Sequence, residues 1–273
     1  MGKGEKLRIG RIPYANLFPI FYMLQKERDC SCYEFVEGVP SKVNALLRSG
    51  QIDVSPSSSI EYLRNPSYYR IVEGNSVSSR GPVGSVFLFS ARPIEELGGV
   101  AVYTTSQSET SVGLLKIILA KFYGLNCPME TTDRPETAGE AFLLIGDDAL
   151  KYSSKLLVAR HSLRVYDLGE LWYRHTGLPF VFALWIIRDG TGGGRECRSE
   201  LLERFAADLT YAKEAALGNL PGIARHAPLR TFMSEEEILS YWKKLDYELT
   251  EEHRKGLGLF GKYLDELRLK GLH

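Results

Sequence analysis

A cluster of hydroxyl side chains, TSQSETS at residues 105–111, stands directly before the apolar run VGLLKIILAKFYG. Ser108 is suited to cap a helix here, because its side chain can accept hydrogen bonds from the free amides of the first turn. Apolar residues then recur at helical spacing up to Gly124, namely Val112, Leu115, Leu119 and Phe122. VAVY at 100–103 is typical of a buried strand, so the unit is a strand, a hydroxyl-rich turn and a helix N-terminus. Such a turn suits an anion, although capping alone also explains one such cluster.

Three further polar clusters follow predicted strands. They are PYAN (13–16), SPSSS (55–59) and IGDD (145–148). Because ligands of open α/β sheets bind beyond the carboxyl ends of the strands, four clusters at strand ends favour a shared small-molecule site. The residues of these four clusters are rich in hydroxyl and amide groups and poor in strong acids and bases. Asp147 and Asp148 are expected mainly to stabilise a helix N-terminus. Such a site binds and orients a polar anion, and it can perform chemistry when the substrate supplies much of the driving force.

Several other functions lose support from the sequence. Lys plus Arg equals Asp plus Glu at 34 each, and neither sign forms a long block, so we expect neither a nucleic-acid nor a membrane-surface partner. No segment approaches the apolar length of a membrane span, and the start lacks the apolar core of a secretory signal, which predicts a cytoplasmic protein.

Motifs for nucleotides, zinc hydrolysis and α/β-hydrolases are absent. The cysteines lack paired metal spacing, so we expect no metal and reduced thiols; they are Cys30, Cys32, Cys127 and Cys197.

The 273 residues allow two modest domains or one large domain, and their pattern alternates between strands and helices. The predicted strands are 7–12, 33–38, 52–55, 83–90, 100–103, 141–146, 165–168 and 178–187. Asn16 is expected to cap a helix that runs through Glu27, and Ser58 and Glu61 are expected to form a capping box. Other helices are predicted over 41–50, over about 197–217, from the Ser234 capping box onward, and over about 250–270. This alternation predicts a mostly parallel α/β sheet.

Six segments, in order along the chain, resemble the chorismate dehydratases of the futalosine route to menaquinone. They are "IPYANLFP" (12–19), "GVPSKVNALLRSGQIDVSPSSSIEYL" (38–63), "SVSSRGPVGSVFLFS" (76–90), "SETSVGLLKIIL" (108–119), "LLIGDDAL" (143–150) and "TGLPFVFALW" (176–185). The resemblance covers about residues 7–188 and implies an α/β, two-lobed fold like the type 2 periplasmic binding proteins, with the active site in a cleft between the lobes. It implies lobe one over 1–90 plus 188–273, lobe two over 91–187, and chain crossings near residues 90 and 187.

The resemblance also implies the reaction and the residues that carry it. Chorismate would lose water to give 3-[(1-carboxyvinyl)oxy]benzoate without a cofactor, in a monomer or homodimer. Asn16 and Ser85 would lie nearest the reacting ring, where Asn16 would orient or polarise; the substrate's own enolpyruvyl carboxylate is one candidate for the proton acceptor. The residues expected to bind substrate are Tyr14, Ser57, Ser58, Ser108, Thr110, Ser111, Gly146, Asp147 and Thr176.

Two alternatives remain open at this point. The enzyme that forms 1,4-dihydroxy-6-naphthoate in the same pathway shares the fold, but its pattern includes a histidine placed as a base, which has no counterpart here. A non-catalytic solute-binding protein would share the fold without the chemistry.

Overall fold

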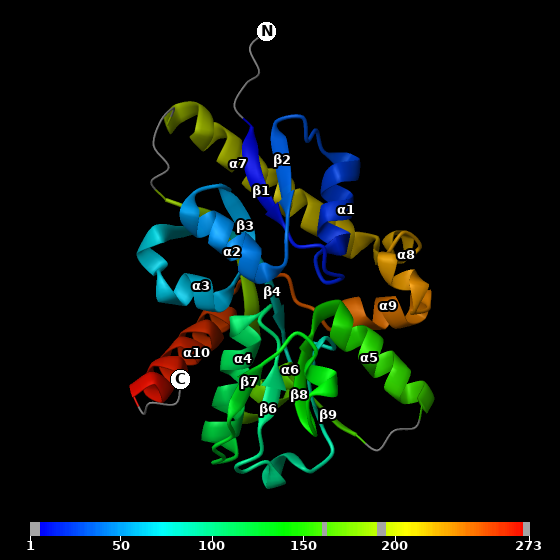
Figure 1. Ribbon diagram of the computed structural model, residues 1–273. Coiled ribbons are helices and arrows are strands. Elements are labelled where there is room, and N and C mark those ends of the chain that lie inside the picture. The colour runs from blue at the N-terminus through cyan, green and yellow to red at the C-terminus, as the bar shows by residue number, and fades with distance from the viewer. Residues whose placement is uncertain (1–5, 160–162, 190–194, 270–273) are drawn as a thin grey trace.

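The computed structural model describes residues 6–159, 163–189 and 195–269, and in these ranges the chain forms two lobes, each built on a five-stranded sheet (Figure 1). The first sheet has the order β2-β1-β3-β10-β4. Its strands are β1 (Leu7–Arg11), β2 (Tyr33–Glu37), β3 (Val54–Ser58), β4 (Tyr69–Ser79) and β10 (Phe180–Arg188). β1 runs parallel to β2 and β3, whereas β10 is antiparallel to both β3 and β4.

The second sheet has the order β7-β6-β8-β5-β9. Its strands are β5 (Val86–Ser90), β6 (Val102–Thr104), β7 (Met129–Thr131), β8 (Ala141–Ile145) and β9 (Arg164–Asp167). β6 is parallel to β7 and β8, and β5 is antiparallel to β8 and β9. Four of the five strands in each sheet therefore run in the same direction, as predicted for a mostly parallel sheet, and only the strand that enters from the other lobe runs against its neighbours.

The places where the chain crosses between the sheets differ from the prediction. β5 pairs in the second sheet and β10 pairs in the first. The chain therefore leaves the first sheet between Ser79 and Val86 and returns between Asp167 and Phe180, one strand earlier than the predicted crossings near residues 90 and 187. An apolar run shows where a strand ends, but the sheet that it joins is decided by pairing with distant strands.

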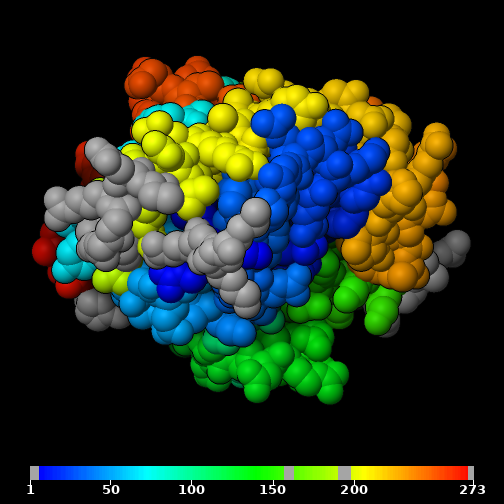
Figure 2. Space-filling view, turned by 90° about the horizontal axis from the view of Figure 1, so that it is seen from above, coloured from blue at the N-terminus to red at the C-terminus, as the bar shows by residue number. Residues whose placement is uncertain are grey.

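The first lobe carries α1 (Phe18–Glu27), α2 (Pro40–Ser49), α3 (Ser59–Arg64) and the long α7 (Arg195–Gly218). α1 packs against α7, and seen from above α7 (yellow) lies beside the blue N-terminal elements (Figure 2). Gly50 ends α2 with φ of 75°, a conformation that glycine adopts without strain. Trp185 on β10 packs between Phe21 of α1 and Phe205 of α7, so the core lies between the sheet and these helices.

The second lobe carries α4 (Glu109–Ile117), α5 (Gly146–Ala159) and α6 (Leu168–Thr176). α4 continues as a π-helical turn over Ile118–Phe122 and ends at Gly124, as predicted. Phe89, Phe142 and Tyr152 pack as an aromatic cluster between the sheet and α5. The sequence did not predict β4, β7 or α6, and β3 lies two to three residues later than predicted.

The C-terminal helices lie beside the junction of the lobes (Figure 1). They are α8 (Leu220–Ala224), α9 (Glu235–Trp242) and α10 (Glu251–Leu269). α10 packs on β10 and α3 of the first lobe and on α4 of the second. The predicted capping box of Ser234 and Glu237 is present at the start of α9. Short 3₁₀ turns span Pro66–Tyr68, Ile94–Glu96, Pro135–Thr137 and Pro228–Thr231. Within the described ranges, no helix has the length and apolar character needed to cross a membrane.

Candidate active site

Asn16 lies in the loop between β1 and α1, and its side chain does not cap the helix. α1 begins at Phe18 with Leu17 as its N-cap residue and no side-chain cap, so the predicted capping role of Asn16 is wrong. Instead, the Oδ1 atom of Asn16 is buried and has no hydrogen-bond partner among the described residues. A buried carbonyl without a partner costs free energy, so Oδ1 of Asn16 can still accept a hydrogen bond from a group outside the described residues.

Ser85 directly precedes β5 and is 2% exposed. Its Oγ accepts a hydrogen bond from the hydroxyl of Tyr241 over 3.2 Å, and its backbone carbonyl accepts one from the amide of Gly146 over 2.8 Å. The two residues before Ser85 are held by Asp167, whose carboxylate accepts the amides of Val83 and Gly84 over 3.0 and 2.7 Å. The position of the Ser85 hydroxyl is therefore determined from both sides.

Contacts across the two lobes bring several predicted site residues together. The amide of Ala15 donates to Oδ1 of Asp147 over 3.0 Å, which sets the turn holding Asn16 against the start of α5. Gly146 has φ of 57°, and a Cβ there would lie 3.1 Å from the ring of Tyr14. The turn that carries Tyr14 and Asn16, the start of α5 and the segment before β5 thus meet at one place, which we take as the candidate site.

The electrostatics of this place favour neutral, hydrogen-bonding groups. Burial raises the pKa of Tyr14, and the nearby charges of Asp148 and Asp147 raise it further, so its hydroxyl stays protonated at neutral pH. Burial also raises the pKa of Asp147, although the Ala15 amide and the charge of Lys151 act in the opposite direction. A cavity of about 240 Å³ lies alongside and is lined in part by Gln107 and Lys151.

The hydroxyl cluster before α4 has two different roles. Ser108 caps α4 as predicted, since its Oγ accepts the amide of Ser111 over 3.3 Å, and the two hydroxyls lie 3.1 Å apart. Thr110 instead reaches the other lobe, where its Oγ1 accepts the amide of Ile60 in α3 over 3.1 Å. The N-termini of α3 and α4 therefore face each other, and among the described residues the Thr110 hydroxyl has no acceptor for its own hydrogen.

Ser57 and Ser58 are bonded within the first lobe. Ser57 pairs with Ser55 through their hydroxyls at 2.7 Å, and Ser58 Oγ accepts Asn44 Nδ2 at 2.7 Å. The predicted capping box of Ser58 and Glu61 is absent, because Glu61 is drawn to Arg48 and to the hydroxyl of Tyr69.

Thr176 closes the turn between α6 and β10. Its hydroxyl donates to the carbonyl of Trp172 over 2.8 Å and accepts the amide of Leu178 over 3.1 Å. In the described part of the chain, no hydrogen bond joins Thr176 to another predicted site residue, so its expected role in binding stays a prediction.

Sequence reasoning missed four side chains that hold the site. They are Gln107, Tyr241, Trp242 and Tyr247. Gln107 stands inside the hydroxyl cluster and could have been noticed there. The other three come from the C-terminal segment and reach the site only through tertiary packing, so no local pattern signals them.

The cysteines and metal-ligating residues form no further centre in the ranges described. Cys30, Cys32 and Cys127 are free thiols, and the side chain of Cys197 lies outside the described residues. No group of three or more His, Cys, Asp or Glu side chains is arranged to hold a metal ion within these ranges.

Known proteins match this chain over nearly its whole length. Residues 7–266 match the family described as menaquinone biosynthesis. The chain is 32% identical over 270 residues to the chorismate dehydratase of Thermus thermophilus, with 94% of each chain covered. A solved protein of Archaeoglobus fulgidus superimposes with a TM-score of 0.77 at 20% identity, covering 99% of both chains.

The periplasmic aliphatic sulphonate-binding protein of Escherichia coli superimposes with a TM-score of 0.65 at 16% identity, covering 97% of this chain and 88% of that one. This likeness shows the fold alone, and it confirms the predicted two-lobed, periplasmic-binding-protein-like architecture. The family match and the full-length relative go further: this chain belongs to the menaquinone-biosynthesis family.

Proposed function

We propose that this protein is a chorismate dehydratase, a carbon–oxygen lyase that removes water from chorismate to give 3-[(1-carboxyvinyl)oxy]benzoate. The observation that carries the proposal is the full-length likeness to the Thermus thermophilus chorismate dehydratase. The buried, unpartnered Oδ1 atom of Asn16 and the buried hydroxyl of Ser85 support the location of the site.

The reaction suits a site without strong acids or bases. Overall the ring loses the proton at C3 and the hydroxyl at C4, which make up one water once the proton acceptor passes its proton to the departing hydroxyl, and the electron pair of the C3–H bond becomes a ring double bond. The ring becomes aromatic, so the overall step is favourable and needs no redox partner. The difficult part is removing a weakly acidic proton from a substrate that already carries two carboxylates.

In this proposal the chain supplies binding and orientation. The free amides at the N-terminus of α4, together with the hydroxyls of Ser108, Thr110 and Ser111, hold one substrate carboxylate. The Asn16 carboxamide and the Ser85 hydroxyl orient and polarise the reacting ring. The substrate's enolpyruvyl carboxylate is the candidate proton acceptor, since Asn16 is too weak a base for that role.

Incubating the purified protein with chorismate tests the proposal. We expect chorismate to disappear while a product one water lighter accumulates, as followed by ultraviolet absorbance and mass spectrometry. The contrary result is chorismate that stays intact; binding without turnover would then favour a solute-binding protein.

A further inference from the structure

The end of α9 contacts both lobes of the site with two adjacent side chains. Tyr241 donates through its hydroxyl to Oγ of Ser85, and Trp242 donates through Nε1 to the carbonyl of Ala15 over 2.9 Å. A few residues later, the hydroxyl of Tyr247 donates to the carbonyl of Asn16. One short segment, residues 241–247, therefore holds the backbone around Asn16 and the side chain of Ser85 together; we call it the brace.

The bond from Tyr241 fixes the direction in which Ser85 can donate. A hydroxyl has one hydrogen and two acceptor lone pairs. Because Ser85 accepts from Tyr241, its own hydrogen is directed elsewhere, and Ser85 Oγ has no second hydrogen-bond partner among the described residues. Burial raises the pKa of Tyr241, although the bond with Ser85 acts in the opposite direction, so its phenol stays protonated and can donate.

Packing holds the hydroxyls of Tyr241 and Ser85 in position relative to each other. Tyr241 is 3% exposed, and a Cβ at Gly84 would lie 3.2 Å from its ring. Gly84 has φ of 74°, so the chain just before Ser85 passes close to the Tyr241 ring at a position that favours glycine.

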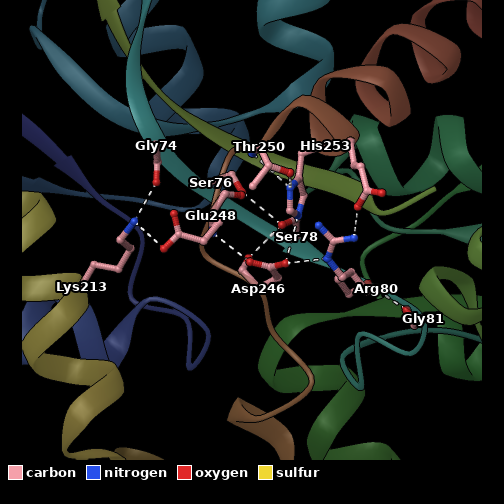
Figure 3. Close-up of polar contacts among 12 residues, drawn as sticks. Gly74, Ser76, Ser78, Arg80, Gly81, Lys213, Asp246, Glu248, Thr250 and His253 are labelled. Carbon is pink, nitrogen blue, oxygen red and sulfur yellow. Dashed lines mark hydrogen bonds and ion pairs between the residues drawn. The ribbon is translucent and has the colours of Figure 1, made fainter.

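The brace is anchored along β4 by backbone bonds (Figure 3). Asp246 and Ser78 exchange amide-to-carbonyl bonds of 2.8 Å in both directions, and the amide of Ser76 donates to the carbonyl of Tyr247 over 3.0 Å. The brace thus pairs with β4 through its backbone. β4 in turn leads into the segment where the chain crosses between the lobes.

Side chains strengthen the same anchor. Figure 3 shows Arg80 and His253 both reaching the carboxylate of Asp246, with Arg80 Nε 3.2 Å and His253 Nε2 3.1 Å from its Oδ2 atom. On the other side, Lys213 lies 2.8 Å from both Glu248 Oε1 and the carbonyl of Gly74. A segment tied down at this many points can act as a rigid support for the site.

We infer that Tyr241 is a positioning residue for the reaction: its hydroxyl bond directs the Ser85 hydroxyl toward the substrate, and the brace holds it there. This inference rests on the proposed chorismate dehydration. It gives the C-terminal segment a part in catalysis, although that segment supplies no group to the substrate.

Steady-state kinetics of Tyr241→Phe, alone and combined with Ser85→Ala, test the inference. Phe keeps the ring that packs on Gly84 and removes only the hydroxyl. We expect kcat for chorismate to fall about tenfold in the single variant, the size of one lost hydrogen bond, while KM stays within about twofold. In the Ser85→Ala background, the same change should alter kcat by less than about twofold, because the hydroxyl that it directs is gone.

Tyr33→Phe is the matched control, since it also removes a buried hydroxyl, which bonds to Asp208 within the first lobe. Its kcat should stay at the wild-type value even where its melting temperature falls as far as that of Tyr241→Phe. An unchanged kcat in Tyr241→Phe, or equal losses in both backgrounds, would overturn the positioning role alone. A wild-type protein that leaves chorismate intact would overturn the proposed function and this inference with it.

Discussion

The hydroxyl of Tyr14 donates to the side-chain carbonyl of Gln107 over 2.6 Å, and this bond joins the loop after β1 to the loop before α4. The bond from Ala15 to Asp147 and the bond from Ile60 to Thr110 cross between the same two lobes. The lobes are therefore in contact around Asn16. Under the proposed function, chorismate would enter before these bonds form, and their formation would then exclude water from the ring.

Tyr14→Phe tests the contribution of this contact to closure. The variant keeps the ring against Gly146 and removes the bond to Gln107. We expect KM for chorismate to rise roughly three- to tenfold, because one hydrogen bond of the closed form is lost. Tyr68→Phe is the control, as Tyr68 is 59% exposed on the first lobe. Equal KM values for both variants would show that closure does not depend on this bond.

Thr110→Val tests whether the hydroxyl cluster holds a substrate carboxylate. A charge-assisted hydrogen bond contributes about 1.5–3 kcal/mol, so KM should rise about ten- to a hundredfold. Thr110→Ser keeps the hydroxyl that accepts the Ile60 amide and should stay within about threefold of wild type. If Thr110→Val melts earlier at an unchanged KM, the hydroxyl only joins the two lobes.

Asp147 should make stability depend on pH. Burial raises its pKa in the folded protein above that of the unfolded chain, so the folded protein binds the proton more tightly. The resulting stabilisation is present below the unfolded pKa of about 4 and is lost as pH rises through the raised folded pKa. Asp147→Asn, which can still accept the Ala15 amide, should therefore gain melting temperature relative to wild type as pH rises from about 4 to about 7.

Asp148→Asn supplies the matched comparison, because Asp148 is its exposed neighbour in the first turn of α5. The raised pKa would be contradicted if the difference in melting temperature between Asp147→Asn and wild type stayed constant across this pH range or shrank toward neutral pH.

Local signals predicted several of the turns that meet at the candidate site. The turns after β1 and β6 and before α5 carry polar residues at strand ends, which can be read along the chain without knowing the fold. The Ser108 cap was predicted correctly for the same reason, since its partner amide is only three residues away. Tyr241 and Tyr247 could not be predicted in this way, because each reaches a site residue more than 150 positions earlier in the chain.

The errors arose where tertiary partners outweigh local preference. Glu61 would complete a capping box with Ser58, but Arg48 and Tyr69 bind its carboxylate instead. β4 was not predicted because its several serines are typical of loops. Ser76 and Ser78 are buried there, since their hydroxyls bond to carbonyls of the C-terminal segment.

Turnover of chorismate by Asn16→Asp tests the central claim most directly. The variant keeps the shape of the side chain, and α1 is unaffected because Leu17, not Asn16, occupies its N-cap. We expect kcat to fall by a factor on the order of 10²–10³, because a preorganised amide is replaced by a carboxylate beside a substrate that is already a dianion. Turnover close to that of the wild type would contradict this expectation and remove Asn16 from the mechanism.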